Sequence, residues 1–219
     1  MVMQTVTEKT IEHGLADRFI RVEQLSRLIG GSAGRRYGLV NRAIKSGELL
    51  RLQRGLYILA DRYRTHHAHP FALAQALAPG SYISFETALS YHGWIPEKVF
   101  ITASVVPSRK SRRYENEITG TYSFYSLATE QGRFLELVNR HQIDGQTMLV
   151  AQPCRALMDL VCLRKIAWEG PGWLSEGLRI DPDLLRSITR QDVNTLKQVY
   201  KHKRLKSFLS SLWRELRSD

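Results

Sequence analysis

The segment GRRYGLVNRAIKS, residues 34–46, contains three arginines, one asparagine and one lysine. Its apolar residues have helical spacing, and a polar stripe follows the i, i+3, i+7, i+10 spacing of one helix face at Arg35, Gly38, Arg42 and Lys45. A guanidinium can hold O6 and N7 of guanine through two hydrogen bonds, and an asparagine amide can bind adenine in the same way. The pattern therefore predicts a helix that reads bases in the DNA major groove.

The neighbouring segments are of the kind that would present such a helix to DNA. Residues 5–18 and 22–29 are expected to be helices, and a Gly-Gly-Ser break separates the second of them from the Arg-rich helix. Residues 48–60 alternate apolar and polar positions around a turn that contains glycine, which predicts a β-hairpin. Three helices followed by a hairpin are the element order of a winged helix-turn-helix.

We expect the DNA contacts to come from this third helix and from the hairpin. Residues at the start of a recognition helix usually enter the groove deepest, and an arginine at a hairpin tip suits a phosphate or the minor groove. The expected contacts are Arg35, Arg36, Tyr37, Asn41, Arg42, Lys45, Arg51, Gln53 and Arg54.

The charge of the chain also favours an anionic partner. Lys and Arg number 32 against 21 Asp and Glu, a net charge of +11. Residues 1–70 carry 12 basic and 6 acidic groups, residues 71–150 carry 7 of each, and residues 151–219 carry 13 and 8. A surplus of this size points first to nucleic acid. The alternative is a solvated basic helix on a protein–protein adaptor.

The second half of the chain predicts a mixed α/β domain that ends in a helical tail. A turn at Asp144-Gly145 indicates a hairpin, and Leu205 begins a one-sided apolar helix. Helices are expected at 70–78, at 84–92 with Ser84 as cap, and from Pro153; β-strands are expected at 98–105, 118–127, 134–143 and 146–151.

These segments together predict an α+β protein of two domains. The first is a winged helix-turn-helix DNA-binding domain at residues 1–64. The second covers residues 70–219, with an α/β core to about residue 165 and a helical tail after it. The polar, His-rich segment 62–70 is the expected boundary.

Two further basic stretches have no assigned partner. A predicted loop at 107–117 forms a secondary basic patch that would touch DNA, RNA or an acidic protein surface, or would simply be solvated. The stretch 197–206 would extend the basic surface or form the solvated face of a helix. The residues of the secondary patch are Arg109, Lys110, Arg112 and Arg113.

The remaining candidates for chemistry favour structural interpretations, so we expect no enzyme, no metal and no cofactor. Ser84, Glu86 and His92 are explained by a capped helix, and Asp159 has no partner carboxylate in view. The histidines of the linker lack a matching cluster of Cys or carboxylates. Cys154 and Cys162 share one predicted helix too far apart to bridge. Free thiols, no evident signal peptide and no long apolar run predict a cytoplasmic protein without a membrane partner.

Three segments resemble successive signatures of the AbiEi-type abortive-infection antitoxins of type IV toxin–antitoxin systems. They are GELLRLQRGLYIL, SYISFETALSYHGW and VAQPCRALMDLVCLRK, and the resemblance covers most of residues 10–165. The chain departs from many relatives at Cys154-Arg155, where a more polar, acidic pairing is usual. Residues after about 170 have no match.

The resemblance implies a winged helix-turn-helix joined to a C-terminal antitoxin domain. Such a protein would repress its own operon by binding inverted-repeat operator DNA, as a dimer on the site, and would counteract a nucleotidyltransferase toxin encoded beside it. The alternative is a stand-alone winged-helix transcriptional regulator whose second domain senses a ligand or dimerises. The operator sequence, the oligomeric state and the way the toxin is neutralised stay open.

Overall fold

The computed structural model of the protein describes residues 5–116 and 119–218, which contain both helices and strands. This content confirms a mixed α and β fold. The chain divides into two units. The first unit extends to Leu77 and takes in Gln142–Gln146; the second unit holds Ala78–His141 and the chain from Thr147 onward. The division therefore falls beyond the predicted linker.

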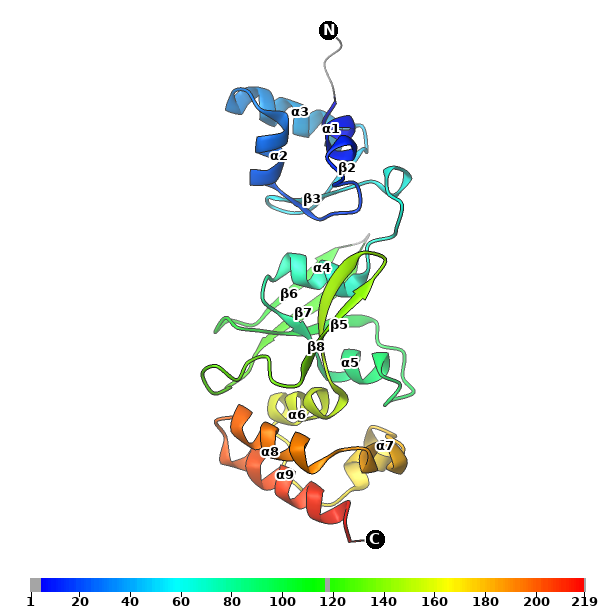
Figure 1. Ribbon diagram of the computed structural model, residues 1–219, viewed down its shortest axis with the longest axis vertical. Coiled ribbons are helices and arrows are strands. Elements are labelled where there is room, and N and C mark those ends of the chain that lie inside the picture. Colours follow the sequence, from blue (N-terminus) through cyan, green and yellow to red (C-terminus); the bar gives the residue numbers. More distant parts are fainter. Residues whose placement is uncertain (1–4, 117–118, 219) are drawn as a thin grey trace. The chain divides into compact units, whose positions relative to one another are not determined.

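In the first unit, the first three helices pack on a small antiparallel sheet (Figure 1). The strand order is β1–β3–β2, with Ile20 opposite Tyr57 and Leu49 opposite Leu59. The elements are α1 (Val6–Glu12), β1 (Ile20–Arg21), α2 (Val22–Ile29), α3 (Ala33–Lys45), β2 (Leu49–Gln53), β3 (Leu56–Leu59), the 3-10 turn η1 (Asp61–Tyr63) and α4 (Pro70–Leu77).

A single apolar cluster holds the three helices on the sheet. The second and third helices contribute residues at the spacing of one helix face, although Val22 of that predicted face is 40% exposed. The cluster consists of Val6, Ile20, Leu25, Ile29, Leu39, Ala43, Leu49, Tyr57 and Leu59.

The first helix is shorter than predicted. We expected a helix over residues 5–18, but α1 ends at Glu12 and Gly14 adopts a φ of +67°. A left-handed residue cannot continue a right-handed helix, and glycine takes that conformation at no steric cost. The chain is then free to turn into β1.

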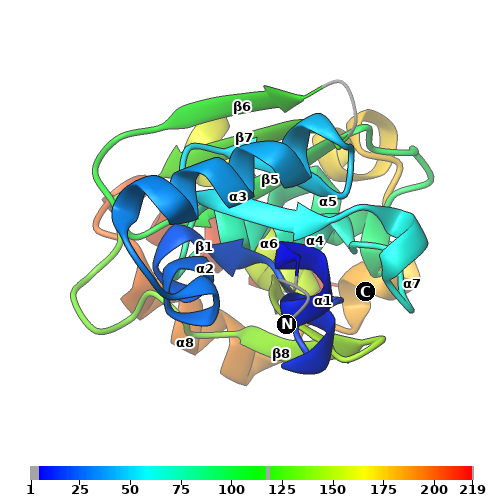
Figure 2. The same ribbon diagram turned by 90° about the horizontal axis from the view of Figure 1, so that it is seen from above.

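The second unit is built on a mixed six-stranded sheet of order β6–β7–β5–β4–β9–β8. Figure 2 shows β6, β7 and β5 side by side. Strand β4 runs antiparallel to β5 and parallel to β9, and β5 runs parallel to β7. The strands are β4 (Tyr82–Ile83), β5 (Ile101–Val106), β6 (Arg112–Asn116), β7 (Gly120–Ser126), β8 (Val138–Ile143) and β9 (Gln146–Ala151).

Helix α6 is the centre of the helical layer, because it contacts α5, α8 and α9. Nine of its twelve residues are buried, from Cys154 to Cys162. Thr189 and Asp192 form a capping box at the start of the helix that follows them, and the predicted apolar stripe of the last helix is present. The helices are α5 (Phe85–Tyr91), α6 (Pro153–Arg164), the π-turn η2 (Trp173–Gly177), α7 (Pro182–Arg186), α8 (Arg190–Val199) and α9 (Lys203–Glu215).

The predicted loop at 107–117 is in part a strand, and residue 117 lies outside the described residues. Residues Arg112–Asn116 form β6, which pairs antiparallel with β7 at the edge of the sheet. Tyr114 lies opposite Tyr122, with ring centroids 6.0 Å apart. The run of charges suggested a loop, but charged residues are also the usual means of protecting an edge strand from pairing with another chain.

Through the described ranges, no helix combines the length and the apolar character that a bilayer crossing requires.

Candidate nucleic-acid interface

Helix α3 places most of the predicted contact residues on its outer side. Leu39 and Ala43 are buried against the core of the first unit. Arg35, Arg42 and Lys45 are exposed, as the polar stripe predicted, and Asn41 is partly exposed. Tyr37 is 73% exposed. The local pattern of the sequence was sufficient to find this face.

Two glycines leave the outer side of α3 without bulk. A Cβ built on Gly34 or Gly38 has no heavy atom within 4 Å. Ser32 begins the helix, and its Oγ accepts a hydrogen bond from the backbone N–H of Arg35 at 3.3 Å. The exposed cations are thus set along a helix whose backbone is accessible between them.

Arg36 lies differently from the prediction that it faces outward. Its side chain is partly buried and donates to the carbonyl of Gly31. The reason is angular, since at about 100° per residue Arg36 falls on the same side as Leu39 and Val40. A base contact from Arg36 stays a prediction, and this guanidinium must leave Gly31 to make it.

Several other cations of the first unit hold its elements together. The Lys9 ammonium donates to the carbonyls of Leu28 and Ile29 at 3.2 and 3.4 Å, at the end of α2. Arg62 donates to the carbonyls of Ser46 and Gly47 at 3.4 and 3.1 Å, after the last turn of α3. Cations at a helix C-terminus satisfy carbonyls that lack helical partners. The net charge therefore overstates the number of cations available to a nucleic acid.

The hairpin presents a second set of predicted contacts. Arg51 and Arg54 are exposed and Gln53 is partly exposed. Arg54 and Gly55 form a tight turn, in which Gly55 has a φ of +77° and its carbonyl accepts the backbone N–H of Val22 at 2.9 Å. The predicted hairpin is confirmed, and its turn is anchored to the start of α2.

Replacing Gly38 with alanine should raise the free energy of unfolding by about 0.5–1 kcal/mol, because alanine favours helix and the added methyl meets open space. Gly47→Ala is the matched control. Its Cβ also meets nothing within 4 Å, but its φ of +67° strains an L-residue, so stability should fall. Urea unfolding followed by circular dichroism checks both. A destabilised Gly38→Ala variant would contradict the open helix face.

The secondary basic patch is less available to a nucleic acid or an acidic protein than the sequence indicated, because two of its four side chains have contacts within the chain. The guanidinium of Arg112 lies over the ring of Phe124, 5.1 Å from its centroid. Arg113 Nε donates to the Glu115 carboxylate at 2.6 Å. Arg109 and Lys110 are exposed in the connection that leads to β6.

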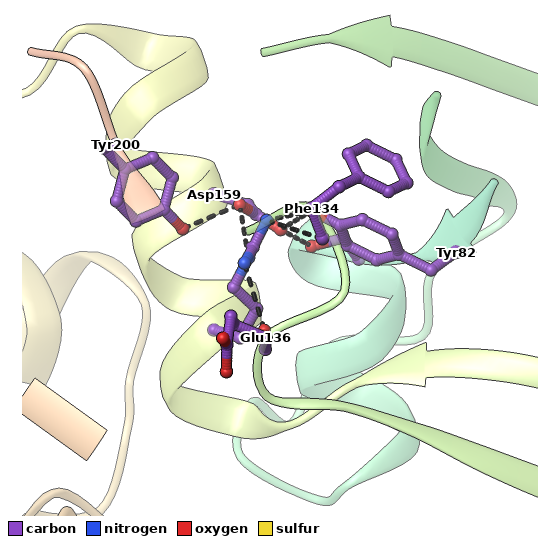
Figure 3. A network of polar contacts seen from close by, with 7 residues as sticks. Tyr82, Phe134, Glu136, Asp159 and Tyr200 are labelled. Atoms are coloured by element: carbon purple, nitrogen blue, oxygen red, sulfur yellow. Dashed lines mark hydrogen bonds and ion pairs between the residues drawn. The ribbon is translucent and has the colours of Figure 1, made fainter. Parts of the chain in front are cut away.

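Sequence reasoning missed a buried ionic network in the second unit. Each of the two carboxylate oxygens of Asp159 accepts two hydrogen bonds. Oδ1 accepts from Arg155 Nε at 3.0 Å and from the Tyr200 hydroxyl at 2.7 Å; Oδ2 accepts from the Tyr82 hydroxyl at 2.9 Å and from Ser84 Oγ at 2.7 Å. Ser84 was expected to cap α5, but its hydroxyl is used here. Figure 3 shows how these side chains meet from α6, β4 and the end of α8.

All three nitrogens of the Arg155 guanidinium donate within this network. Arg155 also donates to the Tyr82 hydroxyl at 2.6 Å and to the carbonyls of Glu136 and Phe134 at 3.0 and 3.3 Å. Burial acts to lower the pKa of Arg155, but the Asp159 carboxylate and the phenol groups of Tyr200 and Tyr82 together outweigh burial, and the pKa is raised. Burial, and then the same carboxylate, raise the pKa of Tyr82 well above 10. The network thus joins the Arg155–Asp159 ion pair to phenol donors that stay neutral, because the pKa of Tyr200 is raised as well.

The network is structural rather than catalytic. Arg155 and Asp159 have no exposed surface, and each of their polar atoms named above already has a protein partner. A signal was present in the sequence, because an Arg and an Asp spaced i, i+4 interrupt an otherwise apolar helix. Buried charges of that kind are almost always paired.

The two cysteines and His92 lie in buried or partly buried surroundings. Cys154 and Cys162 are free and buried, and burial raises the pKa of the Cys162 thiol to about 11. His92 Nε2 lies 2.9 Å from the carbonyl oxygen of Ala151, and burial lowers its pKa. Within residues 5–116 and 119–218, no three His, Cys, Asp or Glu side chains are grouped to hold a metal ion.

No protein-family model matches the chain, and no curated protein matches its sequence. Functional inference therefore depends on the surfaces described above and on the resemblance of short segments.

Proposed function

We propose that residues 5–60 form a winged helix-turn-helix that binds double-stranded DNA, with α3 in the major groove and the β2–β3 hairpin on the backbone. The observation that supports this most directly is the outer side of α3, where Arg35, Arg42 and Lys45 are exposed around glycines that leave the backbone accessible. A helix in the groove needs cations that reach base edges and a backbone that can approach closely. The exposed Arg54 at the hairpin tip suits a phosphate contact.

We further propose that this binding represses the protein's own operon at inverted repeats, and that the second unit acts as the cytoplasmic antitoxin of a nucleotidyltransferase toxin. This part depends on the resemblance to the AbiEi-type family. Two of the resembling segments, residues 81–94 and 150–165, meet at the buried network, because Tyr82 and Ser84 bond to Asp159. Segments whose side chains form one buried network are expected to occur together in the members of one protein family.

The stand-alone regulator stays the alternative, with the second unit used for ligand sensing or dimerisation. The adjacent reading frame discriminates between the two. A nucleotidyltransferase-like sequence there favours the antitoxin, and an unrelated neighbour favours the regulator.

One experiment tests both halves of the proposal. The full chain and its Arg42→Ala variant are each co-expressed with the neighbouring nucleotidyltransferase, and growth is scored while purified proteins are footprinted on the upstream DNA. The full chain should protect inverted repeats and rescue growth. Arg42→Ala should lose protection but still rescue growth, because its substitution lies on α3. Absence of any footprint would contradict DNA binding, and absence of rescue by the full chain would contradict the antitoxin role.

A further inference from the structure

The second unit contains an apolar groove bounded by α5, β5 and α6. Its volume is about 580 Å³, and its walls include Phe85, Ile95, Tyr125, Leu160 and Leu178. The rings of Phe85 and Tyr125 pack edge to face with centroids 5.3 Å apart. Space of this size, lined by aromatic and aliphatic side chains, can accept a large apolar side chain.

An aromatic side chain projects from the rim of the same groove. Phe100 is 81% exposed, more than any other large apolar side chain in the described part of the chain, and Ile101 beside it is 37% exposed. The Lys98 ammonium lies 5.8 Å from the centre of the Phe100 ring. An exposed aromatic next to an apolar hollow forms a contiguous apolar patch, which usually marks an interaction site.

We propose that the occupant of this groove is Phe100 of a second copy of the chain, in a two-fold symmetric dimer. In such an interface the same patch serves both partners, so a patch must contain both the projection and the hollow that receives it. Phe100 and its neighbouring groove meet that requirement within one surface. Because Phe100 also lines the groove, the two Phe100 side chains would meet near the two-fold axis.

The charges at the rim fit a second copy better than a nucleic acid or a strongly charged protein. The rim of the groove carries two ion pairs, Glu86 with Arg164 and Glu97 with Arg179, and Lys98 is exposed next to Glu97. With three cations and two carboxylates among these residues, the patch escapes most of the repulsion that a net charge of +11 imposes on self-association.

Sedimentation velocity of the full chain, without DNA, tests this inference from micromolar to submillimolar concentration. The wild-type chain should show a concentration-dependent dimer, and Phe100→Ser should raise the dimer Kd at least about tenfold. Leu135→Ser is the matched control, since Leu135 is 51% exposed and does not line the groove. It should dimerise as the wild type does. Both substitutions replace exposed side chains, so the melting temperature should change little.

A cross-linking variant locates the contact. Phe100→Cys should form a covalent dimer on mild oxidation, because the two side chains meet across the axis, while Leu135→Cys should not. The native thiols are buried and do not interfere. A wild-type chain that stays monomeric at every concentration, or a dimer that survives Phe100→Ser, would overturn the inference. Binding of the neighbouring gene product in the groove without self-association would overturn it as well. None of these outcomes depends on DNA binding, so failure here leaves that proposal intact.

Discussion

Replacing Asp159 with alanine is expected to destabilise the second unit by about 3–5 kcal/mol. The substitution leaves the Arg155 guanidinium in the interior without its counter-charge, and it leaves the hydroxyls of Tyr82, Ser84 and Tyr200 without their common acceptor. A buried charge that loses its partner keeps the full cost of its removal from water.

Tryptophan fluorescence during urea unfolding measures this effect selectively. The four tryptophans, Trp94, Trp168, Trp173 and Trp213, all belong to the second unit. Asp183→Ala is the matched control, because it breaks an exposed Arg–Asp pair on α7, with an N–O distance of 2.8 Å and side chains 54% and 85% exposed. Exposed pairs contribute little, so the unfolding midpoint should hardly move.

A second comparison separates the charge from the shape of the network. The double substitution Arg155→Met with Asp159→Leu removes both charges and keeps apolar volume, so it should be more stable than Asp159→Ala alone. Equal unfolding midpoints for Asp159→Ala and Asp183→Ala would show that the buried pair does not form.

The double substitution Arg42→Ala with Lys45→Ala is expected to weaken binding to operator DNA roughly 100-fold at moderate salt. Both side chains are exposed on α3, and neither is used to hold another element of the first unit in the hydrogen bonds described above. Each cation that meets a phosphate releases counterions, so the slope of log K against log salt should fall by about one for each phosphate that the variant no longer binds.

Fluorescence anisotropy with a labelled operator duplex gives both the affinity and the slope. Arg186→Ala with Lys197→Ala is the matched control, since it removes the same two charge types from the second unit. It should leave the affinity close to that of the wild type. Binding by the α3 variant with wild-type affinity and salt slope would rule out α3 as the DNA-reading helix.

The parts of the fold that the sequence predicted well are those governed by local pattern. The bounds of α2, α3 and the β2–β3 hairpin follow from periodicity and from a glycine turn, which depend on neighbours a few residues away. Strand β6 was missed because an edge strand tolerates charged residues, so its composition resembles that of a loop. Gly14 was visible in the sequence, but its effect on α1 was underestimated.

The same distinction explains what could be predicted of the candidate site. The outer side of α3 was found from spacing, and the same spacing places Arg36 on the side of Leu39 and Val40, which the prediction overlooked. The Arg155–Asp159 pair was visible in the sequence from its i, i+4 spacing, but its tyrosine partners were out of reach because they are far from it in the chain. Tyr82 lies 73 residues before Arg155, and Tyr200 lies 41 residues after Asp159. No local pattern encodes such distances.

The position of Tyr200 also bears on the order of events during synthesis. All elements of the first unit up to α4 have left the ribosome long before Tyr200 is made, and domains generally fold as units from the N-terminus. Arg155 and Asp159 emerge together on α6, but one of the hydroxyls that satisfies the carboxylate belongs to the end of α8. The nascent chain is therefore expected to complete most of its first unit early, while the Asp159 carboxylate lacks the Tyr200 hydroxyl until translation is almost finished.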